Sequence, residues 1–327
     1  MNAEQRPYRV LLVAGTGQNG ATIMSRVLAQ VPGFVAVGEL GHLWDKGLIE
    51  NRACGCGVAF LECPFWTGVG NVAFGGWANV DAQALTRLRG TLVLKRTPVP
   101  HPFALPLLRW PKLSRGYARA LGRYREALGR VYAGIASTSG ATFIVDSMKV
   151  PAHVYTVAGM PRVDPFLVHL VRDARGVAYS SMKMVLRQGT DDDPYRVRRP
   201  PVKSALRWMW INESFDRLAR RVPSALVRYE SFVAEPAREI SRLATAAGAP
   251  VRPVGIGAID GRSVSLPPDH LFAGNRVRFD EGPVQLREDV EWRSTVARDT
   301  QRRIAMLARP LLTRYGYDPA PAEDAPT

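Results

Sequence analysis

A glycine-rich turn near the N-terminus carries the first residues suited to chemistry. It reads GTGQNGAT from Gly15 to Thr22, after the apolar run Val10 to Ala14, and apolar residues at helical spacing follow it to about Gln30. Such a turn directs several backbone N–H groups and a helix N-terminus at one point, where they attract an anion, above all phosphate. The sequence therefore predicts an anion-binding turn, with a purely structural strand-to-helix turn as the alternative.

The turn fits two nucleotide-binding patterns. It has the spacing of a P-loop, but Ala21 stands where that motif has the lysine that reaches the β- and γ-phosphates. This difference argues against chemistry at a γ-phosphate. Gly15, Gly17 and Gly20 also match the dinucleotide-binding fingerprint, and Glu39 lies about where an acidic residue would hold a ribose hydroxyl. An NAD(P)-binding Rossmann oxidoreductase is therefore an open alternative.

Other chemistry-bearing residues follow apolar runs later in the chain. Asp146 to Lys149 comes directly after the run 142–145, and Arg172 comes directly after the run 166–171. Ligands of parallel α/β sheets collect at the carboxyl ends of the strands. We therefore expect these residues and the glycine-rich turn to share one edge of a sheet.

The elements that position these residues alternate between strands and helices. This alternation predicts an α/β fold, a P-loop-like parallel sheet with helices on both faces and with loop and helical insertions. Expected strands lie at about 10–14, 91–95, 142–145, 166–171 and 226–229, with one more ending near Glu39. Expected helices lie at about 19–30, 81–89, 113–137, from Pro151, from Arg172 to about 186, 205–221, 236–247 and 296–314, the last with a kink at Pro310. We expect loops at 40–75, 98–111, 187–203 and 270–279.

The chain of 327 residues is long enough for one α/β domain, which we place at 1–317. We expect 318–327 to be a disordered tail. No stretch is apolar enough to span a membrane, and the N-terminus lacks the hydrophobic core of a signal peptide. The expected location is the cytoplasm.

The charge balance favours an anionic ligand. Lys plus Arg number 44 against 29 Asp plus Glu, a net charge of +15, which attracts anions at long range. The basic residues form neither a tail nor a pattern interleaved with aromatic residues, as an RNA-binding sheet would show. A nucleotide-type anion in a cleft therefore explains the charge at least as well as a nucleic acid, and we expect no nucleic-acid partner.

All three cysteines, Cys54, Cys56 and Cys63, fall in one short stretch. With the nearby His42 they could in principle hold zinc, but their spacing is not that of a zinc knuckle or ribbon. We expect free thiols and no metal.

Together these segments resemble the sulfotransferases that use 3′-phosphoadenosine 5′-phosphosulfate (PAPS), and most closely the bacterial and tyrosylprotein-type branch. The resemblance covers most of the chain. It rests on the joint occurrence, in the family's order, of GTGQNGAT, Gly38-Glu39-Leu40, Asp146 to Lys149, LVRDARGVAYSS, RYE and the late GNRVR loop.

The resemblance implies a binding site for PAPS, which would be released as 3′,5′-ADP after transfer of its sulfonate group. The turn would cradle the 5′-phosphosulfate, Thr22 would contact a phosphate oxygen, and Arg172 with Ser180 would bind the 3′-phosphate. Tyr229 would lie near the adenine, and the late-loop arginines would close over the 3′-phosphate. The implied donor-binding residues are Gly17, Gln18, Asn19, Gly20, Ala21, Thr22, Arg172, Ser180, Tyr229, Gly274, Asn275, Arg276 and Arg278.

The resemblance also implies the catalytic residues. A hydroxyl acceptor needs a base to take its proton as it attacks the sulfur in line. Glu39 matches the family's proposed base, with His42 as the alternative. Lys149 matches a lysine that would neutralise charge on the bridging oxygen of the leaving group.

One departure from the family pattern concerns the turn, where Gln18-Asn19 replaces the usual Arg-Ser. Gln18 brings no charge, and the loss of a charge-assisted contact could reduce the rate roughly tenfold to a hundredfold. Lys149 or the late-loop arginines could compensate. A non-catalytic nucleotide-binding relative therefore also stays open. For an enzyme, we expect a small-molecule hydroxyl acceptor.

Overall fold

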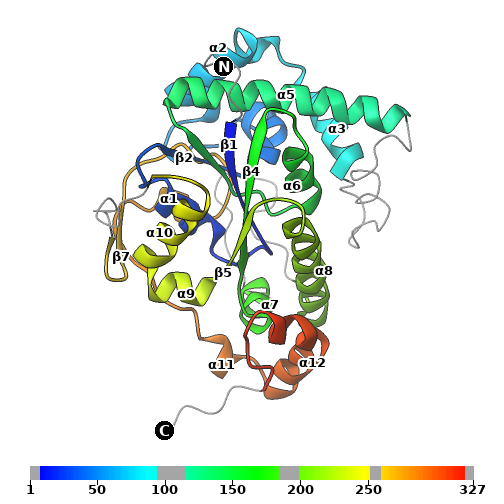
Figure 1. Cartoon of the computed structure of the whole chain (residues 1–327), viewed down its shortest axis with the longest axis vertical. Coiled ribbons are helices and arrows are strands. Elements are labelled where there is room, and N and C mark those ends of the chain that lie inside the picture. The colour runs from blue at the N-terminus through cyan, green and yellow to red at the C-terminus, as the bar shows by residue number, and fades with distance from the viewer. Residues whose placement is uncertain (1–7, 94–114, 184–198, 251–258, 321–327) are drawn as a thin grey trace.

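The computed structural model describes residues 8–93, 115–183, 199–250 and 259–320. Its centre is a five-stranded parallel sheet in the order β2-β3-β1-β4-β5 (Figure 1). The strands are β1 Tyr8–Ala14, β2 Phe34–Gly38, β3 Phe143–Asp146, β4 Val163–Val171 and β5 Ser224–Arg228. Because β3 lies between β1 and β2, the order differs from that of the Rossmann dinucleotide-binding fold, in which these two strands are neighbours.

Both faces of the sheet are buried, which explains the continuous apolar run of β1. Val10, Leu12 and Ala14 belong to one core, while Leu11 and Val13 belong to the other. Alternate residues of a strand point to opposite faces, so a strand covered on both sides must be apolar throughout.

Helices cover the two faces of this sheet. The first core joins the sheet to α5 (Arg115–Ser139), α6 (Pro151–Ala158) and α8 (Pro201–Ala219). The second core joins it to α1 (Ala21–Leu28), α9 (Tyr229–Ala234) and α10 (Pro236–Ala246). The predicted fold class, an α/β parallel sheet with helices on both faces, is confirmed.

The segment after β2 is more regular than predicted. The expected loop at 40–75 contains a 3-10 turn Leu40–His42, a π-helix Leu43–Ile49, a 3-10 turn Phe60–Glu62 and α2 (Pro64–Phe74). Buried aromatic residues hold it together, with the rings of Phe60 and Trp66 stacked 4.9 Å apart. Its glycines and mixed spacing hid these elements from a periodicity analysis.

The prediction of a strand at 91–95 is wrong for residues 91–93, the part that the structure describes. Helix α3 runs from Ala82 through Val93, with Leu92 buried in the first core. The helix continues through these residues because α3 packs against α5 and the π-helix. This packing outweighs the local β propensity of the run.

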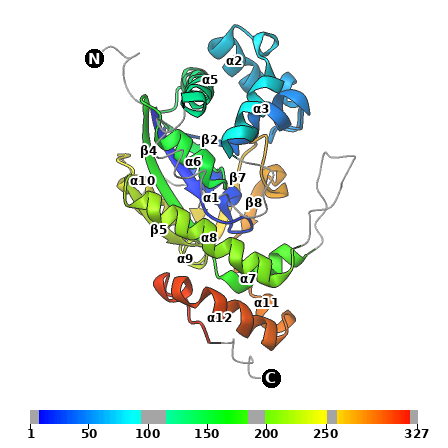
Figure 2. The same ribbon diagram turned by 90° about the vertical axis from the view of Figure 1, so that its right-hand side faces the viewer.

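Two further units complete the fold, a small sheet that was not predicted and a group of helices that were predicted separately. A small antiparallel sheet, β6 Ile259–Asp260, β7 Ser263–Leu266 and β8 Gly282–Gln285, flanks the loop at 270–279. At the end of the molecule opposite α2 and α3 (Figure 2), α7 (Ala174–Met182) and α8 pack with α12 (Arg298–Arg314), which contains Pro310 and follows the short α11 (Trp292–Thr295).

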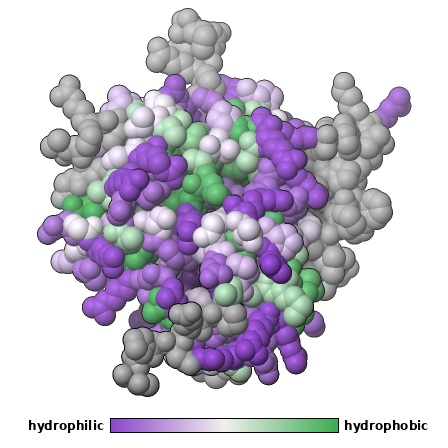
Figure 3. Space-filling view, turned by 60° about the horizontal axis from the view of Figure 1, so that its bottom comes forward, coloured by the Kyte–Doolittle hydropathy of each residue, from purple (hydrophilic) through white to green (hydrophobic). Residues whose placement is uncertain are grey.

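Hydrophilic side chains predominate on the face drawn in Figure 3, with apolar residues between them. Among the described residues, no helix has the length and apolar character needed to cross a membrane. The predicted loop at 98–111, the part 187–198 of the loop predicted at 187–203 and the tail from 321 lie outside the described residues. The loop prediction is wrong from Pro201, where α8 begins. Residues 318–320 are described, and two of their carbonyls accept hydrogen bonds from Arg175.

Candidate functional site

The glycine-rich turn joins β1 to α1 at the carboxyl edge of the sheet. Gly20 has a φ of +86°, and a Cβ there would come within 2.6 Å of the Tyr229 ring. Asn19 is fully buried: its amide donates to the Leu170 carbonyl (2.8 Å), and its Oδ1 accepts from the Ala21 N–H (3.2 Å). The Asn19 side chain thus fastens the turn to β4, a positioning role that the sequence did not reveal.

Arg172 connects the turn to helix α7. It directly follows β4, and its Nη1 donates both to the Gln18 carbonyl (3.0 Å) and to Ser180 Oγ (3.2 Å). Its guanidinium lies over the Tyr229 ring at 4.9 Å. The structure therefore brings together Arg172, Ser180, Tyr229 and the turn, four parts of the predicted donor site.

An acidic residue missed by the sequence analysis lies in the same place. Asp289 Oδ2 is 3.0 Å from Arg172 Nη2 and accepts from Ser180 Oγ at 3.4 Å. Lys183 Nζ is 3.7 Å from the same carboxylate oxygen. Asp289 comes from the segment between β8 and α11, more than a hundred residues from Arg172 in sequence, so no local signal pointed to it.

The RYE segment also contributes a positioning residue. Glu230 accepts from the Asp173 N–H (3.2 Å) and from the Tyr317 hydroxyl (2.7 Å). It thereby holds the turn between β4 and α7 in which Arg172 lies.

Glu39 and Lys149 form an ion pair on the other side of the turn. Glu39 follows β2 and Lys149 follows β3, so two adjacent strand ends bring them together. Burial acts to raise the pKa of Glu39, but the charges of Lys149 and His42 help outweigh it, and the pKa is lowered to about 2. Glu39 is therefore ionised at neutral pH.

His42 lies beside Glu39, with Nε2 3.6 Å from Glu39 Oε2. Its Nδ1 is 3.4 Å from Asp45 Oδ1, and Asp45 in turn accepts two hydrogen bonds from Arg89, at 2.8 and 2.5 Å. Burial lowers the pKa of His42 below its ordinary value, while the hydrogen bond to Asp45 acts to raise it. Asp45 and Arg89 were not predicted; they hold the imidazole in place.

Asp146 fixes the two strand ends that carry Glu39 and Lys149. It is fully buried, and its carboxylate accepts from the Met148 N–H (3.1 Å) and the Tyr132 hydroxyl (2.8 Å) and contacts His153 Nε2 (2.9 Å). The acidic residue of the DSMK segment thus has a positioning role in this structure.

A cavity of about 200 Å³ is lined both by residues of the glycine-rich turn and by residues around Glu39. It is lined by Gly17, Gln18, Glu39, His42 and Lys149, among others. Two arginines that the sequence analysis did not select, Arg199 and Arg207, also line it. Arg199 belongs to the basic cluster in 187–203, where nothing in the sequence distinguishes it from the neighbouring basic residues.

The late loop at 270–279 also contacts the glycine-rich turn. The Asn275 N–H donates to Thr22 Oγ1 (3.3 Å), and Gly274 comes so close that a Cβ would lie 3.2 Å from the same oxygen. Arg278 is buried and donates to the Gly274 carbonyl (3.3 Å), whereas Arg276 is exposed. Burial lowers the pKa of Arg278, while the charges of Glu39 and Asp269 act to raise it. The closure of Arg278 over a 3′-phosphate stays a prediction.

Comparisons with known proteins find similarity to solved structures. No family model and no curated protein matches the chain. The chain is similar to several solved sulfotransferase structures. They include the sulfotransferase domain from the Synechococcus PCC 7002 olefin synthase (17% identity, 96% of both chains, TM-score 0.49), that from the curacin biosynthetic pathway (14%, 96% of this chain and 98% of the other, TM-score 0.48) and sulfotransferase STF9 from Mycobacterium avium (13%, 98% and 80%, TM-score 0.42). At these values the argument for an activity rests on the residues of the site.

Proposed function

We propose that this chain transfers a sulfonate group from PAPS to the hydroxyl of a small-molecule acceptor by in-line displacement. The observation that carries the proposal is the position of Gln18. Its carbonyl accepts from Arg172, and the same residue lines the cavity that contains Glu39 and Lys149. A candidate phosphate site and a candidate acid–base pair therefore lie on opposite sides of one glycine-rich turn.

The residues on the Arg172 side fit an anionic nucleotide end. Arg172, Ser180 and Lys183 already surround one anionic group, the carboxylate of Asp289. A phosphate needs the same donor set, and charge-assisted hydrogen bonds of this kind contribute roughly 1.5 to 3 kcal/mol each. In the proposed complex Arg172 and Ser180 hold the 3′-phosphate, and the Tyr229 ring lies near the adenine.

The residues of the turn would hold the 5′ end. Backbone N–H groups of residues 17 to 22 lie at the N-terminus of α1, where partial positive charge favours an anion. The donor supplies an activated sulfonate and a leaving phosphate when it is bound. Thr22, whose hydroxyl accepts from the Asn275 N–H, would donate its proton to a phosphate oxygen.

Glu39 and Lys149 would move the proton and stabilise the leaving group. Without a ligand, Lys149 helps to hold the pKa of Glu39 at about 2, which makes Glu39 a weak base. If Lys149 turned toward the leaving group of a bound donor, Glu39 would lose that partner, and burial, the largest influence on it, would raise its pKa. The carboxylate would then be a stronger base when the acceptor hydroxyl needs one.

His42 is the alternative base. In the tautomer that donates Nδ1–H to Asp45, Nε2 is left as an acceptor beside Glu39. Asp45 and Arg89 would then orient the imidazole as the third group of a catalytic triad does.

Arg199 and Arg207 are candidates to replace the arginine that the glycine-rich turn lacks. Both line the cavity that Gln18 lines. We propose that they supply the positive charge that Gln18 lacks, in addition to Lys149. A catalytic enzyme is therefore favoured over a non-catalytic relative. The strand order argues against the Rossmann oxidoreductase, and so does the pairing of Glu39 with Lys149, which occupies the carboxylate that would hold a ribose hydroxyl.

Calorimetric titration with 3′,5′-ADP tests this proposal. We expect 3′,5′-ADP to bind at least tenfold more tightly than 5′-AMP or NADH, and we expect Arg172→Ala to abolish the preference. Arg217→Ala, which removes an exposed arginine of α8, is the matched control. Equal binding of 3′,5′-ADP and 5′-AMP, or preferred binding of NADH, would overturn the proposal.

A further inference from the structure

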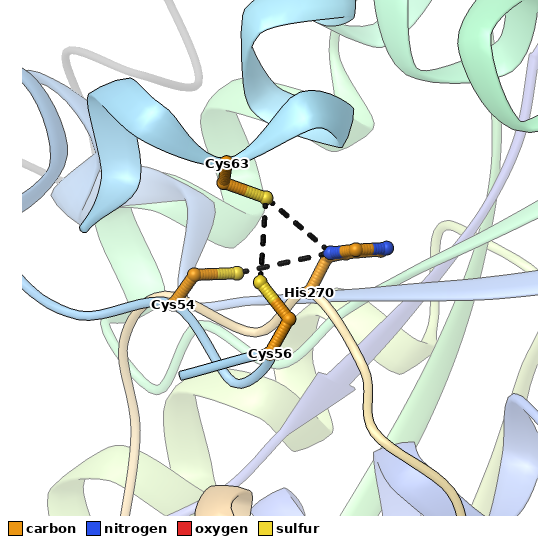
Figure 4. A group of neighbouring side chains, drawn as sticks. All are labelled: Cys54, Cys56, Cys63 and His270. Atoms are coloured by element: carbon orange, nitrogen blue, oxygen red, sulfur yellow. Dashed lines mark hydrogen bonds between the residues drawn. The ribbon is translucent and has the colours of Figure 1, made fainter. Parts of the chain in front are cut away.

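The three cysteines converge on a histidine that is more than two hundred residues away in sequence. The sulfur atoms of Cys54, Cys56 and Cys63 and the Nδ1 atom of His270 all lie within 4.8 Å of one another (Figure 4). In the figure, Nδ1 points toward the sulfurs and the second ring nitrogen points away from them. His42, the histidine considered from the sequence, instead faces Glu39 and Asp45.

The distances within this Cys3His cluster match those of a tetrahedral metal site. Cys56 Sγ and Cys63 Sγ are 3.6 Å apart, and His270 Nδ1 is 3.4 Å from Cys63 Sγ and 3.9 Å from Cys54 Sγ. In a tetrahedral zinc site with Zn–S of about 2.3 Å and Zn–N of about 2.0–2.1 Å, ligand sulfurs lie about 3.8 Å apart and sulfur and nitrogen about 3.5 Å apart. These three distances fit one tetrahedral zinc ion, and no distance within the cluster exceeds 4.8 Å.

The backbone holds the first two sulfurs on a tight turn. The Cys54 N–H donates to the Val58 carbonyl (2.7 Å) and the Gly57 N–H to the Cys54 carbonyl (3.0 Å). Gly57 has a φ of +89°, and at Gly55 a Cβ would lie 2.3 Å from Asp269 Oδ1. Glycine is thus needed on both sides of Cys56, once for conformation and once for close approach to the segment that carries His270.

The third sulfur lies at the start of a helix. Cys63 is the N-cap of α2, whose first residue is Pro64. Pro64 restricts the backbone at the first position of the helix, so the start of α2 fixes the place of this sulfur.

The surroundings of His270 fix its ring. The Phe65 ring stacks on it at 4.7 Å with an angle of 6° between the planes, and Trp66 Nε1 donates to the His270 carbonyl (2.8 Å). Phe60, Trp66 and Phe272 pack edge to face or stacked within about 5 Å of one another nearby. An apolar shell of this kind limits access of water to a metal and its ligands.

We propose that Cys54, Cys56, Cys63 and His270 bind a structural zinc ion. Zinc is the metal that tetrahedral sets of thiolate and imidazole ligands favour. Four protein ligands fill its coordination sphere, so the ion has no open position for a substrate and its role is to hold segments together. It ties the segment 54–63, inserted after β2, to the segment that leads into the late loop. This proposal replaces the expectation of free thiols and no metal.

The zinc ion would also support nucleotide binding, a consequence that rests on the proposed function. Four residues separate His270 from Asn275, the residue that contacts Thr22 in the turn. Loss of zinc would leave the late loop tied to the segment 54–63 mainly by backbone contacts such as that of the Gly55 N–H with the Leu271 carbonyl (2.8 Å). We expect removal of zinc to weaken binding of 3′,5′-ADP several-fold, whereas zinc binding itself does not depend on the activity of the chain.

Metal content of the wild-type protein is the first test. We expect protein expressed with added zinc and purified under reducing conditions, without an affinity tag that binds metal, to contain about one zinc per chain. All three thiols should resist a thiol reagent until a strong chelator is added, and added zinc should restore their protection. A zinc content below about a tenth of an equivalent, with freely reacting thiols, would overturn the proposal. So would a disulfide between Cys56 and Cys63 in protein kept from oxidants.

Variants identify the ligands. We expect Cys54→Ser, Cys63→Ser and His270→Ala each to lower the zinc content and the melting temperature. Val58→Ser changes an exposed residue of the same turn and should retain zinc. If a ligand variant fails to fold, substitution of cobalt for zinc in the wild-type protein provides the test. Cobalt in a tetrahedral site with three thiolate ligands gives intense d–d bands in the visible range and thiolate charge-transfer bands at shorter wavelength. Cobalt spectra without these features, or full zinc retention by all three ligand variants, would contradict the assignment.

Discussion

Arg172 and Asp289 form an ion pair of 3.0 Å at the carboxyl end of β4. Arg172 Nη2 also donates to the backbone carbonyl of Asp289 (3.1 Å), so the two residues are joined by both side chain and backbone. Ser180 donates to the same carboxylate (3.4 Å). In the proposed complex a 3′-phosphate takes the place of this carboxylate.

Asp289→Asn should therefore strengthen nucleotide binding. The substitution removes a negative charge that competes for Arg172 and that repels a phosphate, while the backbone contact stays. We expect 3′,5′-ADP to bind about threefold to tenfold more tightly, a gain of about 0.7 to 1.4 kcal/mol. Isothermal titration calorimetry measures it. Glu288→Gln makes the same change of charge at the neighbouring residue, which pairs with Arg293, and should have little effect. Weaker binding in Asp289→Asn would mean that the carboxylate positions Arg172 and does not compete with a ligand.

The identity of the base can be tested with Glu39→Gln and His42→Ala. Gln keeps the shape of the side chain but cannot accept a proton, so we expect kcat to fall by about 10² to 10⁴. His42→Ala should reduce kcat less than tenfold. Release of 3′,5′-ADP with a panel of phenolic acceptors measures turnover, and binding of 3′,5′-ADP verifies that each variant is folded. The reverse order of the two effects would assign the base to His42.

The resemblance supplied the pair Arg172 and Ser180, and local rules place one at the end of a strand and the other on the next helix. It also supplied Glu39 and Lys149, which both follow apolar strands. The two strands are neighbours in the sheet, so the structure brings these two residues together. The periodic pattern of α5 and the alternation of strands and helices were sufficient for the fold class.

The parts that were missed depend on contacts between distant segments. Asp289 meets Arg172 across 117 positions, and His270 meets Cys63 across 207. Asn19 was assigned to the donor site, but its amide bonds to Leu170, across 151 positions. A residue's type and neighbours in sequence do not reveal such partners, because only the packed sheet brings them together.

Acid should destabilise the protein partly through Glu39. Its pKa is about 2 in the folded chain against an ordinary value of 4.5, so its contribution is fully present above pH 4.5 and is lost as the pH falls toward 2. This difference corresponds to about 3 kcal/mol. We expect the free energy of unfolding to fall less steeply between pH 5 and pH 2 in Glu39→Gln than in the wild type. Glu62→Gln, which removes an exposed carboxylate, should retain the wild-type slope. An unchanged slope in Glu39→Gln would contradict the lowered pKa.

Arg207→Ala should reveal whether the cavity arginines replace the missing charge of the turn. The variant removes one of the cations that line the cavity with Gln18, so we expect kcat/KM for PAPS to fall about tenfold, equivalent to about 1.4 kcal/mol. Adding Gln18→Arg to this variant should restore part of the loss, because it returns a guanidinium to the place where the family has one. Arg217→Ala removes an exposed arginine from the same helix and should leave kcat/KM unchanged. If Arg207→Ala has no effect, or if Gln18→Arg lowers activity further, the positive charge at the sulfonate comes from Lys149 and not from α8.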